Sequence, residues 1–120
     1  MISYVLLFAL LPCVLTEAPS DDEREAILEC HRKLREGVQP PASNMALLTY
    51  STELEQLADA FVNGCKSSFP GSDLQYQNVG YIQPPSSDRK LDYRHVLCNV
   101  DSSNYTYKDN TCDGSCYEYK

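Results

Sequence analysis

The chain has 120 residues, which is enough for one domain at most. Its formal charge of −7 repels phosphate backbones, so we expect no nucleic acid among its partners. It has only five glycines and no glycine-rich phosphate loop, and no Ser-His-Asp or Cys-His pattern stands in a supporting context. The sequence therefore predicts no catalytic residues.

The first residues have the composition of a secretory signal peptide. MISYVLLFALLPCVLTEA has no charged side chain before Glu17, and its apolar run from Val5 to Leu15 is about 11 residues, well short of the roughly 20 that a membrane span needs. We predict a signal peptide over residues 1–17, cleaved near Thr16 or Ala18, with a buried N-terminal helix as the alternative. The chain has no second apolar run, so we expect no transmembrane segment and a secreted, extracellular protein.

Residues 20–37 carry the signals of an amphipathic helix at both ends. Ser20 and Glu23 have the spacing of a capping box, acidic residues open the helix, and Gly37 ends it. One apolar stripe runs along the helix at helical spacing. Its members are Ile27, His31, Leu34 and Val38. We interpret His31 as a hydrogen-bonded core residue rather than as a ligand.

A proline-containing link leads to a second helix. Pro40 and Pro41 hold the backbone extended, and residues 45–50 are expected to form a short buried segment. Ser51 or Thr52 then caps a helix over residues 51–65. Its apolar stripe predicts a core-facing packing surface and not a cofactor site. The stripe consists of Leu54, Leu57, Ala58, Phe61, Val62 and Cys65.

The second half of the chain has weaker patterns. Residues 66–77 are expected to form a loop, residues 78–83 a short strand ended by Pro84 and Pro85, and residues 86–100 a segment with a helix capped by Ser87 or Asp88. Residues 104–116 are rich in turns, and Asn104 begins an N-glycosylation sequon. We interpret the tyrosines of this part as packing on a sheet rather than as a ligand platform. They are Tyr105, Tyr107, Tyr117 and Tyr119.

Five cysteines follow the predicted signal peptide, and in an oxidising compartment they indicate disulfides. They are Cys30, Cys65, Cys98, Cys112 and Cys116. Because five is odd, one thiol lacks a partner or has its partner outside this chain, and we favour Cys30 or Cys98 as the unpaired one. Cys112 and Cys116 are close enough in sequence to bridge each other, with a zinc site as the less favoured alternative.

Several features follow one another without a gap between residues 27 and 65. They are His31-Arg32, the run Pro40-Pro41-Ala42-Ser43-Asn44-Met45, an aromatic residue at Tyr50, the pattern Leu54-x-x-x-Ala58 in the second helix, and Cys65. In this order they resemble the start of a CAP (SCP) domain, which is shared by cysteine-rich secretory, antigen 5 and pathogenesis-related-1 proteins. In style the sequence is similar to the venom allergen-like proteins of parasitic flatworms.

The resemblance continues more faintly and implies a fold. Residues 76–79, 98–101 and 116–120 stand where the family has further motifs. The implied fold is α+β, an α–β–α sandwich, with residues 18–120 as its N-terminal portion: the N-terminal helices are present and part of the central sheet is missing. We therefore expect a C-terminally truncated chain, either a truncated gene model, a splice product or a degenerate copy.

The resemblance also implies a site whose residues have changed. Family members place two His and two Glu in a cavity that can bind a divalent metal. Here the first His has no counterpart in residues 66–72, where Phe69 is nearest in spacing. The other three positions match Gln77, Asp101 and Glu118. No imidazole remains, so we expect no metal, no cofactor and no enzyme activity.

For function, the resemblance implies a secreted, non-enzymatic protein. Such a protein is expected to bind a lipid or sterol, or to modulate an extracellular host partner. The alternatives are a non-functional or unstable truncated fragment and, less favoured, a metal-dependent hydrolase.

Overall fold

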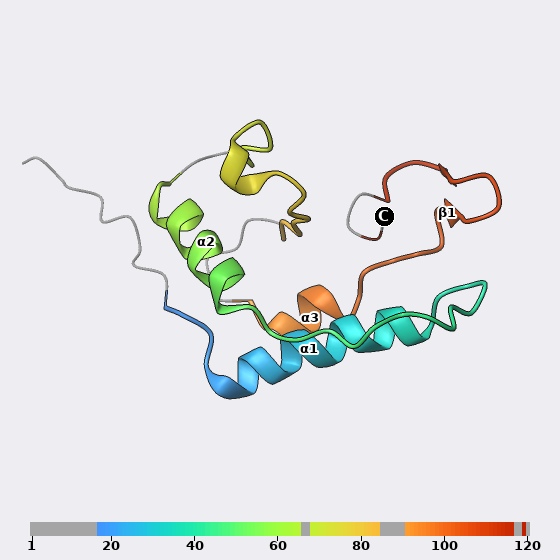
Figure 1. The fold of residues 1–120 in the computed structure, drawn as a ribbon, viewed down its shortest axis with the longest axis horizontal. Helices are drawn as coiled ribbons and strands as arrows, with labels where there is room; N and C mark the ends of the chain where they lie inside the picture. The colour runs from blue at the N-terminus through green and yellow to red at the C-terminus, as the bar shows by residue number, and fades with distance from the viewer. Residues whose placement is uncertain (1–16, 66–67, 85–90, 117–118, 120) are drawn as a thin grey trace, which may run out of the picture. The chain divides into compact units, whose positions relative to one another are not determined.

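The computed structural model describes residues 17–65, 68–84, 91–116 and 119. It has helices α1 (Asp21–Glu36), α2 (Thr52–Asn63) and α3 (Tyr93–Leu97), a 3-10 turn η1 (Leu74–Tyr76), and two short strands, β1 (Tyr105–Thr106) and β2 (Thr111–Cys112) (Figure 1). The protein is thus a mixed α and β chain with a small antiparallel sheet. None of the helices within the described ranges is both long and apolar enough to cross a membrane. Most of the predicted signal peptide, residues 1–16, lies outside those ranges.

The chain divides into two compact units, which are described separately. One contains residues 51–69 with α2, and the other contains residues 19–50 and 70–120 with the remaining elements.

Helix α1 begins and ends where its sequence signals predict. The Ser20 hydroxyl accepts a hydrogen bond from the Glu23 amide at 3.3 Å, and the Glu23 carboxylate accepts one from the Ser20 amide at 2.8 Å. At the other end the Gly37 amide donates to the Lys33 carbonyl at 3.1 Å. These contacts pair amides and carbonyls that have no partner within the helix.

The face that α1 buries is not the predicted one. Ala26 and Cys30 are its buried residues, whereas the predicted stripe is only half-buried. Ala26 and Cys30 are four residues apart and small, so they let a second helix approach closely. That helix is α3, which lies beside α1 (Figure 1).

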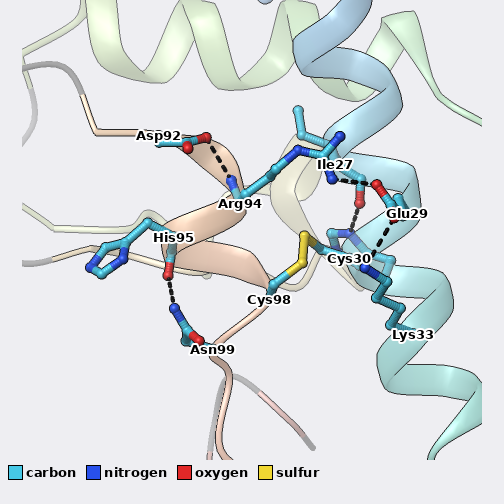
Figure 2. Close-up of a disulfide and its surroundings, with 10 residues drawn as sticks. Ile27, Glu29, Cys30, Lys33, Asp92, Arg94, His95, Cys98 and Asn99 are labelled. Atoms are coloured by element: carbon cyan, nitrogen blue, oxygen red, sulfur yellow. Dashed lines mark hydrogen bonds and ion pairs between the residues drawn. A yellow bond between two sulfur atoms is a disulfide. The ribbon is translucent and has the colours of Figure 1, made fainter.

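A disulfide between Cys30 and Cys98 joins α1 to α3, with the Cα atoms 4.7 Å apart (Figure 2). The prediction that one of these two cysteines is unpaired is therefore wrong. The two positions are 68 residues apart, so no local spacing pointed to the pair. Cys112 and Cys116 form the expected second disulfide, Cys65 is disulfide-bonded as well, and none of the cysteines in the described ranges is free.

Helix α3 has only five residues and depends on its caps and cross-links. The Asp92 carboxylate accepts from the Arg94 amide at 3.0 Å, and the Asn99 side-chain amide donates to the His95 carbonyl at 2.7 Å. The helix is shorter than predicted, and its cap is Asp92. The predicted caps Ser87 and Asp88 lie outside the described residues.

Helix α2 also forms as predicted, but its apolar stripe is not buried. The Ser51 hydroxyl caps it by accepting from the Leu54 amide at 3.2 Å. No residue of α2 is buried, and Leu54 and Val62 are 52% and 45% exposed. Within its unit the Phe61 ring lies 6.1 Å from that of Phe69. The prediction of a core-facing stripe is wrong for these residues, because burial needs a second apolar surface and the described residues of this unit supply little of one.

Two further predictions, a buried segment at residues 45–50 and a strand at residues 78–83, are also wrong. Residues 45–50 are not a buried segment, since Leu47 is 89% exposed. Residues 78–83 form no strand, because the sheet of the described chain pairs only β1 with β2. Just before them lies η1, where Asp73 caps the turn and Tyr76 is buried.

The sheet is a hairpin, and the Cys112–Cys116 disulfide joins the end of its second strand to the segment that follows. Tyr105 pairs with Cys112, and Thr106 pairs with Thr111. In the connecting turn the Asn110 amide donates to the Tyr107 carbonyl at 3.2 Å, and Asn110 has a φ of 52°. Asparagine tolerates this left-handed conformation better than most residues.

Candidate functional site

A groove lies beside the C-terminal half of α1. It has a volume of about 780 Å³, which is within the usual size of small-molecule sites. Its lining comes from three segments: α1, the link at residues 38–45 together with Leu48, and three tyrosines near the C-terminus. We call this cavity the groove.

The α1 wall contains most of the stripe that was expected to face a core. His31, Leu34 and Val38 all line the groove. Helical spacing places them on one face of the chain, as predicted. The sequence pattern correctly predicted that these three side chains share one face. In the structure this face lines the groove and is not packed against a core.

The link forms the second wall of the groove. After the end of α1 the chain turns and runs back beside the helix (Figure 1). The Arg35 guanidinium donates to the Ala46 carbonyl at 2.6 Å. Farther along, the Arg24 guanidinium lies 5.7 Å from the centre of the Tyr50 ring, close enough for a cation–π contact. The segment after α1 is thereby held to the helix at two points. It is not extended at the prolines as predicted, because the chain bends at residues 39–40 and 43–44 and turns back toward α1.

Three tyrosines form the third wall. Tyr105 and Tyr107 come from the hairpin, and Tyr119 follows it. The rings of Tyr105 and Tyr119 lie 5.6 Å apart and tilted by 53°, and the Tyr105 hydroxyl donates to the Asn110 side-chain oxygen at 3.1 Å. Tyr107 is 63% exposed. Tyr105 and Tyr119 pack on each other, but all three tyrosines also present aromatic surface to the groove, which differs from the prediction of packing on a sheet alone. Tyr117 lies outside the described residues.

The described residues that line the groove include no carboxylate. In a chain of net charge −7, the charged or titratable residues of the lining other than tyrosine are His31 and Arg35. His31 Nδ1 lies 2.7 Å from the Ile27 carbonyl oxygen. Because a carbonyl can only accept, Nδ1 is the donor in this hydrogen bond. The prediction that His31 is hydrogen-bonded is confirmed.

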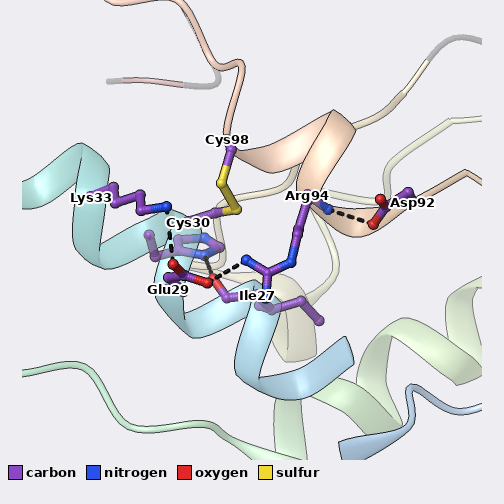
Figure 3. A network of polar contacts seen from close by, with 8 residues as sticks. Ile27, Glu29, Cys30, Lys33, Asp92, Arg94 and Cys98 are labelled. Atoms are coloured by element: carbon purple, nitrogen blue, oxygen red, sulfur yellow. Dashed lines mark hydrogen bonds and ion pairs between the residues drawn. A yellow bond between two sulfur atoms is a disulfide. The ribbon is translucent and has the colours of Figure 1, made fainter. Parts of the chain in front are cut away.

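A charged network lies on α1 next to the Cys30–Cys98 disulfide. Glu29 accepts from Arg94, and its other oxygen lies 3.0 Å from Lys33 Nζ (Figure 3). The hydrogen bond from Arg94, followed by the one from Lys33, lowers the pKa of Glu29 from 4.5 to about 2. The same pairing raises the pKa of Arg94. This network connects α1 to α3, so we assign it to stability rather than to ligand binding.

Of the positions matched to the family's metal site, the structure describes Phe69, Gln77 and Asp101. Asp101 accepts hydrogen bonds from both the amide and the hydroxyl of Ser103 at 2.8 Å, and these lower the pKa of its carboxyl. Gln77 is exposed after η1, and Glu118 lies outside the described residues. In the part of the chain that the structure describes, no three His, Cys, Asp or Glu side chains come together as metal ligands.

Sequence reasoning did not find the groove, because its walls come from segments about 70 residues apart. The signal available was the amphipathic stripe followed by a proline-containing link, which together indicate a helix with a segment folded back on it. No sequence pattern near the C-terminal tyrosines indicated that they would lie next to this helix and link.

Comparison with known proteins finds relatives among cysteine-rich secretory proteins. The mouse protein "Cysteine-rich secretory protein LCCL domain-containing 1" is 34% identical over an alignment of 106 residues, and the match covers 82% of this chain. The chicken protein of the same name is 46% identical over 48 residues, 40% of the chain. Human "Cysteine-rich secretory protein LCCL domain-containing 2" is 48% identical over 44 residues, 37% of the chain.

The chain spans only a small part of these relatives. The matched regions cover 20% of the mouse protein and 9% of both the chicken and the human protein. No protein-family profile and no solved structure matches the chain. The relatives named here are vertebrate proteins, so the similarity to flatworm venom allergen-like proteins stays a prediction.

Proposed function

We propose that the chain is part of a secreted, CAP-type protein of the cysteine-rich secretory kind. The similarity to proteins of that name, the disulfides and the motif order of residues 27–65 support this proposal. The α–β–α sandwich, with residues 18–120 as its N-terminal portion, belongs to the proposal as well. Secretion would place the cysteines in a compartment where disulfides form and persist.

The role we propose is non-enzymatic binding of a sterol or another lipid in the groove. The observation that carries it is the lining, in an otherwise acidic chain: it has leucine, valine, methionine, proline and tyrosine side chains and, among the described residues, no carboxylate. Apolar and aromatic walls with a few polar groups are typical of sites for small apolar ligands. The lost metal ligands do not weaken this role, because binding in an apolar groove does not use them.

A fluorescent sterol titration tests the proposal, and the chain offers a matched pair of variants. Leu48 lines the groove and is 44% exposed, whereas its neighbour Leu47 is 89% exposed and does not line it. We expect saturable binding by the secreted chain. Leu48→Asp should weaken this binding roughly tenfold or more, because it puts a charge against an apolar ligand. Leu47→Asp should leave it unchanged.

Circular dichroism of both variants should show unchanged helix content, since neither side chain is buried. Binding that does not saturate, or that equals binding to the reduced and alkylated chain, would contradict the proposal. So would an equal loss in the two variants. Modulation of an extracellular host partner remains a prediction of the resemblance.

A further inference from the structure

The hairpin has one aromatic face and one polar face. Successive residues of a strand point to opposite sides, so Tyr105 and Thr106 of β1 face opposite ways. The hydrogen bond from the Asp113 amide to the Asn104 carbonyl continues the pairing by one residue, which puts Asn104 on the side of Thr106. Tyr105 and Tyr107 line the groove, and burial follows the alternation: Tyr105 is half-buried and Thr106 is exposed. Asn104 and Thr106 therefore lie on the face turned away from the groove, which we call the outer face.

The partner strand continues both faces. Thr111 stands opposite Thr106, and Cys112 stands opposite Tyr105. The Asp113 amide donates to the Asn104 carbonyl at 2.8 Å, which places Asp113 beside Asn104. The outer face is thus made of four exposed polar residues. They are Asn104, Thr106, Thr111 and Asp113.

The Asn104 side chain has no structural task in the described chain. Its backbone carbonyl holds the hairpin, but its amide group makes no hydrogen bond to the described residues. Two nearby asparagines, in contrast, use their side chains in hydrogen bonds. The Asn99 amide donates to the His95 carbonyl, and the Asn110 side chain accepts from Tyr105. Of the three, Asn104 alone also begins an Asn-x-Thr sequon with a residue other than proline in the middle.

We propose that Asn104 carries an N-linked glycan that covers the outer face of the hairpin and leaves the groove open. The donor would be a lipid-diphosphate-linked oligosaccharide of the secretory pathway. The side-chain nitrogen of Asn104 forms a bond to the anomeric carbon, the bond from that carbon to the diphosphate oxygen breaks, and the amide gives up one proton as the lipid diphosphate leaves. A glycan is bulky and hydrophilic, so it belongs on an exposed polar face such as this one. The inference rests on the secretory part of the proposed function.

Translation of the full chain with microsomes tests the modification. We expect a protease-protected product that carries one glycan. Removal by peptide-N-glycosidase should convert one residue to Asp, and peptide mass spectrometry should place that conversion at Asn104. Asn104→Gln and Thr106→Ala should lose the glycan, whereas the matched variant Thr106→Ser should keep it.

The outcomes separate this inference from the proposal of secretion. A product that is protease-protected but unmodified would overturn the glycan and leave secretion standing. A product that remains protease-sensitive would overturn both. A conversion at any residue other than Asn104 would overturn the assignment of the site.

The position of the glycan has its own test, which needs no groove ligand. Nitration of tyrosine, mapped by mass spectrometry, reports how accessible each ring is. If the glycan lies on the outer face, Tyr105 and Tyr107 should react at the same rate before and after enzymatic deglycosylation. A several-fold faster reaction of Tyr107 after the glycan is removed would place the glycan over the groove and overturn the proposal.

Discussion

At the scale of single residues, Glu29 makes the clearest electrostatic contribution to the fold. Its pKa is lowered from 4.5 to about 2, because ionised Glu29 accepts a hydrogen bond from Arg94 and another from Lys33. A group whose pKa falls on folding stabilises the folded state above its unfolded pKa and loses that effect as the pH falls through the folded value. The stabilising effect should therefore be complete above pH 4.5 and disappear between about pH 4.5 and 2.

Denaturant unfolding of wild type and Glu29→Gln across this pH range measures the effect. The two proteins should differ in unfolding free energy at neutral pH and converge near pH 2. Glu53→Gln is the matched control, since Glu53 is exposed and lies outside the network. A difference between wild type and Glu29→Gln that stays constant down to pH 2 would contradict this assignment.

Ala26 tests the packing of α1. It is buried with 5% exposure, so Ala26→Leu adds volume to a closed contact and should cost about 1–3 kcal/mol of unfolding free energy. Ala58→Leu on α2 makes the same chemical change at an exposed position and should stay within about 0.5 kcal/mol of wild type. Urea denaturation compares the two variants. Equal effects would mean that Ala26 does not lie in a packed interface.

At the scale of elements, the two disulfides should differ in how much they stabilise. Cys30–Cys98 closes a loop with a sequence separation of 68, and Cys112–Cys116 one with a separation of 4. By the chain-entropy relation the first contributes about 4 kcal/mol and the second about 2 kcal/mol. Double serine variants of each pair, compared by chemical denaturation, should follow this order. A larger loss for the Cys112/Cys116 variant would show that the hairpin and not the α1–α3 contact limits stability.

The elements also show which features a sequence can predict. The ends of α1 and the start of α2 were predicted because Ser20, Glu23 and Ser51 act within one turn of themselves. The partner of Cys30 and the exposure of Leu54 were missed, since both depend on what a distant segment places next to them. Residues 78–83 have a strand-like composition, but a strand also needs a neighbour to pair with.

At the scale of the whole molecule, the small size of the buried core explains why apolar side chains are left to line the groove. The described residues that are buried are Ala26, Cys30, Tyr76 and Cys116. So small a core leaves the apolar stripe of α1 available to line a cavity. The candidate site could be predicted only as separate parts, because the stripe, the link and the tyrosines are recognisable locally but their meeting is set by the fold.

The absence of enzyme activity is a proposal that belongs to the same scale. The secreted chain should show no hydrolysis of casein or simple esters above the rate of a reduced and alkylated control. The expected reason is that no imidazole remains, since Phe69 is nearest to the first histidine position and Glu118 matches the second. In addition, Gln77 replaces one carboxylate of the family's site, and Asp101 keeps the other on a shorter side chain. Robust hydrolysis that a chelator abolishes would contradict the non-enzymatic role.

The central claim is that the groove is the ligand site, and photo-crosslinking with a diazirine sterol tests it most directly. Mass spectrometry of the labelled protein should find cross-links in residues 38–48 and on Tyr105 or Tyr107, and excess unlabelled sterol should abolish them. Labelling confined to the exposed stripe of α2, or labelling that unlabelled sterol does not displace, would contradict the claim.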